Sequence, residues 1–202
     1  NLGLILQREK DYLGAIKKYE QALKLNKDSL EAYNNLSKAY LDSGRIVKAK
    51  EVIEQGLQKD KKNVPLLSNL IDIYLLNREL NQAEALCNKL LSINPKSSGV
   101  YNALGSIAEK KGNFNLAKER FETALSLNPK NLQVKVNIAA MLQHSGEIYS
   151  AIEAYEKVLK NHDNLDARYN CSEALLTVGD FKKGWIRYDF RWDVFPANKV
   201  KW

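Results

Sequence analysis

A chain of 202 residues, 45% of them hydrophobic and 27% charged, has enough apolar side chains for a packed core, which excludes an intrinsically disordered protein. The net charge of +7 does not indicate a nucleic-acid partner, because 24 Asp and Glu are interspersed among 31 Lys and Arg at the i,i+3 and i,i+4 spacings of solvated helix faces. No apolar run approaches the ~20 residues of a transmembrane helix, and the opening NLGLILQREKD lacks the features of a signal peptide. We therefore expect a cytoplasmic protein with no membrane partner.

The strongest signal in the chain is a repeat of 34 residues. Alanines keep this step along the chain, and a glycine follows after 33 residues: Ala15, Ala49, Ala83, Ala117, Ala151 and Gly184. An apolar residue stands thirteen positions before each member of this series. Turn glycines recur in the same register, at Gly44, Gly112, Gly146 and Gly179. Because these registers agree, the sequence predicts an array of about six similar units.

In chain order, the predicted units cover residues 1–29, 30–63, 64–97, 98–131, 132–164 and 165–192, and a tail covers 193–202. The first unit begins six positions into its first helix. In the second unit, residues 30–44 (LEAYNNLSKAYLDSG) form one helix that ends at Gly44, and residues 45–60 (RIVKAKEVIEQGLQKD) form the next. The third and fourth units share the closing phrase L-S-(I/L)-N-P-K. Helices of roughly 14 residues are marginal alone, so each pair must pack on its neighbours.

The fourth unit, YNALGSIAEKKGNFNLAKERFETALSLNP, carries the residues on which a resemblance rests: Tyr101, Leu104, Gly105, Ala117, Phe121, Ala124 and Pro129. This pattern resembles the tetratricopeptide repeat (TPR), a helix–turn–helix unit of 34 residues. The resemblance covers nearly the whole chain and implies an all-α fold, a right-handed TPR superhelix (α-solenoid) of about six repeats. It also implies that the first helix of each repeat lines an inner, concave wall. The chain departs from the family pattern at Gly56, Leu90 and Val158, where the family has Ala.

One polar position on the first helix of each unit is almost always asparagine. At 100° per residue, Asn35 leads a polar stripe beside the packing side of its helix. The same position reads Asn1, Asn35, Asn69, Ala103, Asn137 and Asn170 along the chain, with Asn102 adjacent to the exception. An Asn side chain both donates and accepts hydrogen bonds, so this ladder would hold amide units of an extended peptide. With the other residues of the stripe, the predicted partner-binding face comprises Asn1, Asn35, Lys38, Asn69, Asp72, Asn102, Lys110, Asn137, His144, Tyr169 and Asn170.

Two interpretations of the asparagines stay open, and both can hold together. In one, the side chains contact a protein ligand in the groove; in the other, they hydrogen-bond between neighbouring first helices and set the curvature of the solenoid. The ladder is similar to the one that lines the TPR superhelix of O-linked N-acetylglucosamine transferases, in which the phrase NLG is also repeated. That resemblance favours ligand binding. The mixed charge of the stripe argues against RNA and against a dedicated two-carboxylate clamp.

The C-terminal segment GDFKKGWIRYDFRWDVFPANKVKW (179–202) begins as a second helix and then departs from the repeat. Its aromatic residues are predicted to cap the array or to dock a further domain, and a homodimer contact is a third alternative: Trp185, Tyr188, Trp192 and Trp202. The phrase GDFKKGWIRYDFRW resembles the end of the TPR arm in bacterial proteins that continue into a glycosyltransferase domain. This resemblance implies a bacterial source and a downstream catalytic domain.

The chain carries no recognisable catalytic motif. Its two histidines, His144 and His162, have no partner at a telling spacing, and no Gly-rich phosphate loop or H-E-x-x-H is present. Cys87 and Cys171 lie outside any C-x-x-C spacing, so we expect buried free thiols in a reducing compartment. We therefore predict a non-enzymatic interaction module that binds a protein or peptide segment, with no catalytic residue, cofactor or metal. The alternative is the substrate-recruiting arm of a larger glycosyltransferase.

Overall fold

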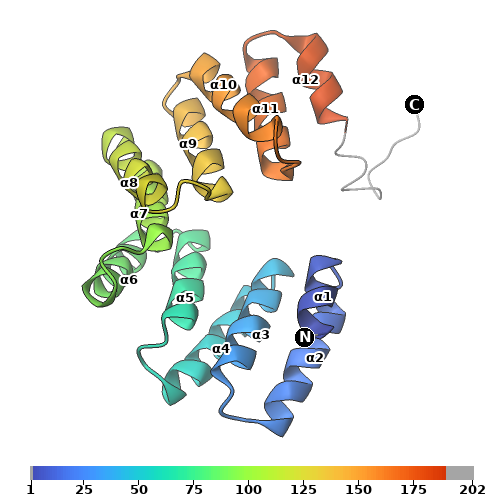
Figure 1. Ribbon diagram of the computed structural model, residues 1–202, viewed down its shortest axis with the longest axis vertical. Coiled ribbons are helices and arrows are strands. Elements are labelled where there is room, and N and C mark those ends of the chain that lie inside the picture. Colours follow the sequence, from blue (N-terminus) through green and yellow to red (C-terminus); the bar gives the residue numbers. More distant parts are fainter. Residues whose placement is uncertain (1, 190–202) are drawn as a thin grey trace. The chain divides into compact units, whose positions relative to one another are not determined.

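The computed structural model describes residues 2–189, which form helices joined by short turns and contain no strand. Figure 1 shows consecutive helices folding back on each other as hairpins. The helices are α1 (Leu2–Arg8), α2 (Tyr12–Leu25), α3 (Leu30–Asp42), α4 (Ile46–Lys59), α5 (Val64–Leu76), α6 (Leu80–Ile93), α7 (Ser98–Lys110), α8 (Phe114–Leu127), α9 (Leu132–His144), α10 (Ile148–Leu159), α11 (Leu165–Thr177) and α12 (Phe181–Tyr188). The predicted all-α helical-repeat class is therefore confirmed. Within residues 2–189, no helix has the length and apolar content needed to cross a bilayer.

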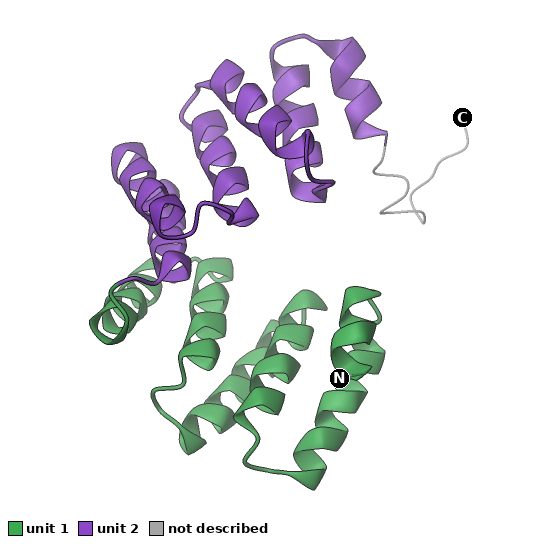
Figure 2. Cartoon of the chain, viewed as in Figure 1, with its two compact units in different colours: residues 1–95 green, residues 96–202 purple. Residues whose placement is uncertain are grey.

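The chain divides into two compact units, residues 1–95 and residues 96–202 (Figure 2). The described part of the first, unit 1, contains α1 to α6, and that of the second, unit 2, contains α7 to α12. Each unit therefore holds three helical hairpins, in which an odd-numbered first helix is followed by an even-numbered second helix. The boundaries of the six predicted repeats and of the tail stay a prediction, and residues 190–202 lie outside the described part of the chain.

The first helices begin at residues that cap them. From α3 onward, each is preceded by Ser or Asn, whose side-chain oxygen accepts a hydrogen bond from the backbone N–H three residues later: Ser29, Asn63, Ser97, Asn131 and Asn164. Such a cap satisfies one of the N–H groups that a helix start leaves without a partner. Short polar side chains at one repeated position thus fix where each first helix starts.

The turn inside each hairpin needs a left-handed backbone. Four of these turns use the glycines found in the sequence, with φ between 73° and 91°: Gly44, Gly112, Gly146 and Gly179. In unit 1, Lys10 (φ 62°) and Arg78 (φ 60°) take the same conformation at the corresponding positions. A side chain makes this conformation less favourable, so two turns of unit 1 carry strain that the turns of unit 2 do not.

The repeated alanines let paired helices approach closely. All five alanines of the 34-residue series are fully buried. In two hairpins a glycine of the first helix lies against an aromatic ring of the second: a Cβ built on Gly3 would come within 2.6 Å of Tyr19, and one on Gly105 within 2.5 Å of Phe121. Both distances are too short for a carbon–carbon contact, so these rings occupy the space that a larger residue would need.

Both cysteines are buried and free, as expected. Burial raises the pKa of the Cys87 thiol to about 12 and that of the Cys171 thiol to about 11. A thiolate is therefore scarce at neutral pH at either position, which makes both cysteines packing residues and not nucleophiles.

Candidate protein-binding face

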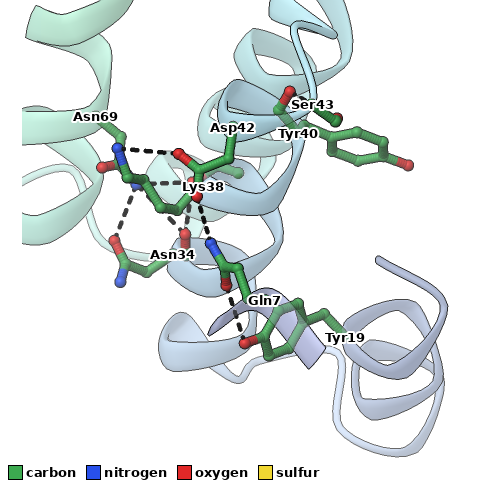
Figure 3. Close-up of polar contacts among 9 residues, drawn as sticks. Gln7, Tyr19, Asn34, Lys38, Tyr40, Asp42, Ser43 and Asn69 are labelled. Atoms are coloured by element: carbon green, nitrogen blue, oxygen red, sulfur yellow. Dashed lines mark hydrogen bonds and ion pairs between the residues drawn. The ribbon is translucent and has the colours of Figure 1, made fainter. Parts of the chain in front are cut away.

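Asn69 on α5 is bonded to the preceding first helix, α3. Its Nδ2 donates to the backbone oxygen of Asn34 at 3.3 Å, to the Oδ1 of Asn34 at 3.1 Å and to the Oγ of Ser37 at 2.9 Å (Figure 3). A backbone carbonyl can only accept, so the orientation of the Asn69 amide is fixed. The residue is 9% exposed. The donor half of Asn69 is thus used inside the protein, and only its Oδ1 remains.

Asn35 on α3 is half-buried and keeps more of its hydrogen-bonding capacity. Its Oδ1 accepts from the Nδ2 of Asn34 at a long 3.4 Å, and no described residue accepts from its own Nδ2. Asn35 and Glu31 line a pocket of about 330 Å³ in unit 1, whose other walls come from α1, α2 and the cap of α3: Leu2, Gly3, Lys18, Tyr19, Ala22, Ser29 and Ala32. Asn35 therefore offers a free donor at the edge of a hollow.

A second polar chain joins the first helices of unit 1 near their C-terminal ends. Gln7 on α1 donates from Nε2 to the Oδ2 of Asp42 on α3 at 2.7 Å, and its Oε1 accepts from the hydroxyl of Tyr19 at 3.3 Å (Figure 3). Lys38 pairs with the other oxygen of Asp42, with Nζ and Oδ1 3.3 Å apart. Asp42 thus receives a donor from each of two helices.

Asp72 lies one turn after Asn69 on α5 and has an exposed side chain. Desolvation by the surrounding protein nevertheless raises its pKa; the charge of Lys38 lowers it and that of Asp42 raises it further. An exposed carboxylate that is still partly desolvated lies in a concave part of the surface. Lys38, Asp42 and Asp72 therefore form one electrostatic group on the first helices of unit 1.

Unit 2 repeats the asparagine pair. Asn137 on α9 donates from Nδ2 to the Oδ1 of Asn102 on α7 at 2.9 Å, and its own Oδ1 accepts from Nε2 of Gln133 at 3.0 Å. Asn102 and Asn137 are half-buried. Both members of this pair were predicted from the sequence as binding residues, and the structure brings them into contact with each other.

The C-terminal ends of α7 and α9 are joined by a titratable pair. His144 Nδ1 and Glu109 Oε1 lie 2.7 Å apart, with the His144 side chain 64% exposed and that of Glu109 14% exposed. The pair becomes an ion pair when the imidazole is protonated. Lys110, which follows Glu109 at the end of α7, is exposed.

Asn170 on α11 contacts the fully buried Tyr155 on α10. Burial is the main cause that raises the pKa of the Tyr155 phenol, and the hydrogen bond with Asn170 opposes it. The hydroxyl of Tyr155 also donates to the Oε1 of Gln143 at 3.2 Å. Asn170 therefore satisfies a buried polar group, which is the structural part of the two roles considered for the ladder.

The predicted C-terminal aromatics gather between α11 and α12. The ring centroids of Tyr169 and Tyr188 are 5.7 Å apart, and Trp185 meets Tyr188 edge-on at the same distance. A hydrogen bond with Glu173 raises the pKa of Tyr169 to about 12. Trp185 stays half exposed. The remaining predicted residues of this group, Trp192 and Trp202, and Asn1 of the ladder lie outside the described residues.

The sequence missed several partners of the predicted residues. Asn34, Ser37, Gln7 and Glu109 each bond a side chain on the next first helix. Three of these four contacts join positions 35 residues apart, one more than the repeat length. A comparison of polar residues at the 35-residue step would have found those three, because neighbouring first helices are offset by about one residue.

The described residues show no arrangement typical of catalysis. Between residues 2 and 189, no three His, Cys, Asp or Glu side chains come together so that they could hold a metal ion. The face of the first helices offers hydrogen-bond donors, acceptors and charges of both signs, which suits recognition of a polypeptide.

Comparison with family models identifies the class of protein. Residues 66–167 match the model of the tetratricopeptide repeat protein 21 C-terminal ARM domain, and residues 6–62 match a tetratricopeptide repeat model. The chain belongs to the tetratricopeptide repeat family. No curated protein matches it.

Solved structures agree with this fold. A tetratricopeptide repeat protein from Parabacteroides merdae is similar with a TM-score of 0.81 at 19% identity, over 94% of this chain and 74% of that one. A thermophilic TPR protein of Thermus thermophilus is similar with a TM-score of 0.78 at 24% identity, over 87% and 96%. YrrB, described as a TPR protein with an unusual peptide-binding site, has a TM-score of 0.52 at 18% identity, over 89% and 93%. At these identities the likeness shows the fold alone.

Proposed function

We propose that the face of the first helices binds an extended segment of a partner protein and that the chain acts as a non-catalytic interaction module. TPR proteins generally mediate protein–protein interaction. The observation that carries the proposal is hydrogen-bonding capacity left open along this face: the Nδ2 of Asn35 and the Oδ1 of Asn69 have no partner among the described residues. An extended backbone offers an N–H and a C=O at every residue, which matches a row of such atoms. A peptide-binding site is described for YrrB, and a comparable use of the fold is proposed for this chain.

The amides of the ladder divide the work in this proposal. Asn69 and Asn137 already donate to a neighbouring first helix, so each offers a ligand its oxygen and not a complete amide. Asn35 offers its donor. Since one hydrogen bond contributes about 0.5–1.5 kcal/mol, each such contact changes an affinity by about two- to tenfold.

The test starts from a library of random twelve-residue peptides displayed on phage, from which binders of the 202-residue protein are selected. The dissociation constant of a selected peptide is then measured by fluorescence anisotropy for the wild type, for Asn35→Ala and for Gln55→Ala. Gln55 is an exposed amide on the second helix α4 and serves as the matched control. We expect Asn35→Ala to weaken binding by about two- to tenfold and Gln55→Ala to leave it unchanged. Equal affinities for all three proteins would contradict the proposal.

We keep a second proposal, in which the module recruits substrates for a glycosyltransferase domain. The phrase GDFKKGWIRYDFRW at residues 179–192 supports it. The coding sequence beyond Trp202 tests it, because several hundred residues with an α/β pattern support a catalytic domain and a stop codon contradicts one. The half-exposed Trp185 further supports docking or self-association through the C-terminal aromatics, which sedimentation of the wild type and of Trp185→Ser would detect.

A further inference from the structure

The oxygen of Asn69 is an unusual acceptor. Its side chain is more than nine-tenths buried and is held by three hydrogen bonds through the nitrogen. No described residue donates to the oxygen, and every fully buried polar side-chain atom of the described chain has a partner. The Asn69 oxygen therefore reaches the surface, held rigidly and without a donor.

Carboxylates accompany this oxygen on the same face of unit 1. Asp72 follows Asn69 by one helical turn, so both side chains lie on one side of α5. Asp72 also senses the charges of Lys38 and Asp42 across the gap to α3. Ser37, which accepts from Asn69, directly precedes Lys38 in the chain. The group thus brings together one carbonyl oxygen and two carboxylates.

The charges of this group do not balance. Lys38 pairs with Asp42 at 3.3 Å and is the only cation whose charge measurably affects Asp72 among the described residues. Two carboxylates with one ammonium leave one negative charge, and Asp72 is already partly desolvated. A second donor of positive charge would stabilise the ionised form of Asp72.

We propose that Asn69, Asp72 and Asp42 form a subsite on unit 1 for an arginine side chain of the bound segment. This inference rests on the proposed function, since it names the chemistry of the ligand at that face. A guanidinium group presents five N–H donors in a fixed plane, so it bridges a carboxylate and a neighbouring carbonyl oxygen better than an ammonium does. Lys38 competes for the same carboxylates and thereby limits the affinity.

The probe is the peptide acetyl-Gly-Arg-Gly-amide, compared with the same peptide containing citrulline, which keeps the shape and removes the charge. Both are titrated into the ¹⁵N-labelled 202-residue protein, and the side-chain amide signals of Asn69 and Gln55 are followed by NMR. We expect the arginine peptide to shift the Asn69 signal saturably and to bind at least fivefold more tightly than the citrulline peptide. The Gln55 signal should stay in place.

Three variants sharpen the test. Asp72→Asn should weaken binding of the arginine peptide about five- to tenfold, and Lys38→Gln should strengthen it by about threefold because it removes the competing cation. Glu54→Gln, which removes one negative charge from an exposed position on α4, should change nothing. Equal binding of both peptides, or equal loss in Asp72→Asn and Glu54→Gln, would overturn the subsite. The proposed function is judged separately by the selected twelve-residue peptides, because those bind through Asn35 whether or not arginine is preferred.

Discussion

Units 1 and 2 make the same contacts at corresponding positions with different chemistry. Asn69 donates to Asn34 in unit 1, and two repeat steps later Asn137 donates to Asn102 in unit 2. Tyr19 donates to Gln7, and four steps later Tyr155 donates to Gln143. The geometry of these bonds therefore belongs to the repeat and not to either unit alone.

The charges of the two units differ where the geometry agrees. Gln7 and Asp42 join α1 and α3 at 2.7 Å, and three repeat steps later Glu109 and His144 join α7 and α9 at the same distance. The unit 1 pair loses its charge only in acid, whereas the unit 2 pair changes charge when the imidazole titrates. The repeat fixes where polar groups meet, and the individual residues set what each face recognises.

The largest expected effect tests the close helix approach that both units share. Gly105→Ala should lower the free energy of unfolding by about 1–3 kcal/mol, because the new methyl group would overlap the Phe121 ring. Urea denaturation measures the change. Gly99→Ala on the same helix is the control, since a Cβ there meets nothing within 4 Å, and it should be neutral or slightly stabilising. Equal losses in both variants would contradict the packing argument.

The next effect separates the asparagine pairs of the two units. Asn69→Ala should cost about 1–3 kcal/mol, because it removes three hydrogen bonds and leaves the buried Ser37 with one partner fewer. Asn137→Ala should cost about 0.5–1.5 kcal/mol, because its contacts are half-buried. Hydrogen exchange of amides in α5 and α9 measures each loss in its own unit. A larger loss for Asn137→Ala would show that the pairs do not differ as described.

A smaller effect concerns the turns, which are strained in unit 1 only. Arg78→Gly should stabilise the protein by about 0.5–1 kcal/mol, because glycine accepts the left-handed backbone found there. Gly112→Ala, at the matching turn of unit 2, should destabilise it by about 1 kcal/mol. Thermal unfolding followed by circular dichroism compares the two, and a shift of the same sign in both variants would refute the assignment of strain.

The smallest expected effect is the pH dependence contributed by Asp72. Folding raises the pKa of Asp72, so its favourable contribution is complete below its unfolded value and is lost as pH rises through the raised folded value. At neutral pH Asp72→Asn should therefore be as stable as the wild type or slightly more stable, and the difference should shrink in acid. Urea denaturation at pH 7 and at pH 3 tests this. A clear loss of stability in Asp72→Asn at pH 7 would contradict the direction of the shift.

Much of the fold could be predicted from the sequence because short-range rules decide it. The 34-residue series predicted the positions of Ala49 and Ala117 between paired helices, and Gly44 marked a left-handed turn. Arg78 could not be predicted in that conformation, since only glycine signals it locally. The hydrogen bonds of Asn69 were also out of reach, because they depend on how far α5 is offset from α3 and not on residue type. The predicted binding residues consequently include side chains whose donors the fold already uses.

The most direct test of the central claim is a map of side-chain amide signals by NMR with a selected peptide bound. The amides of Asn35, Asn102 and Asn137 lie on first helices, and those of Gln55 and Asn115 lie on the second helices α4 and α8. If the first-helix face binds the segment, signals of the first group should shift in proportion to occupancy while those of Gln55 and Asn115 stay in place. Shifts confined to Gln55 and Asn115 would contradict the account.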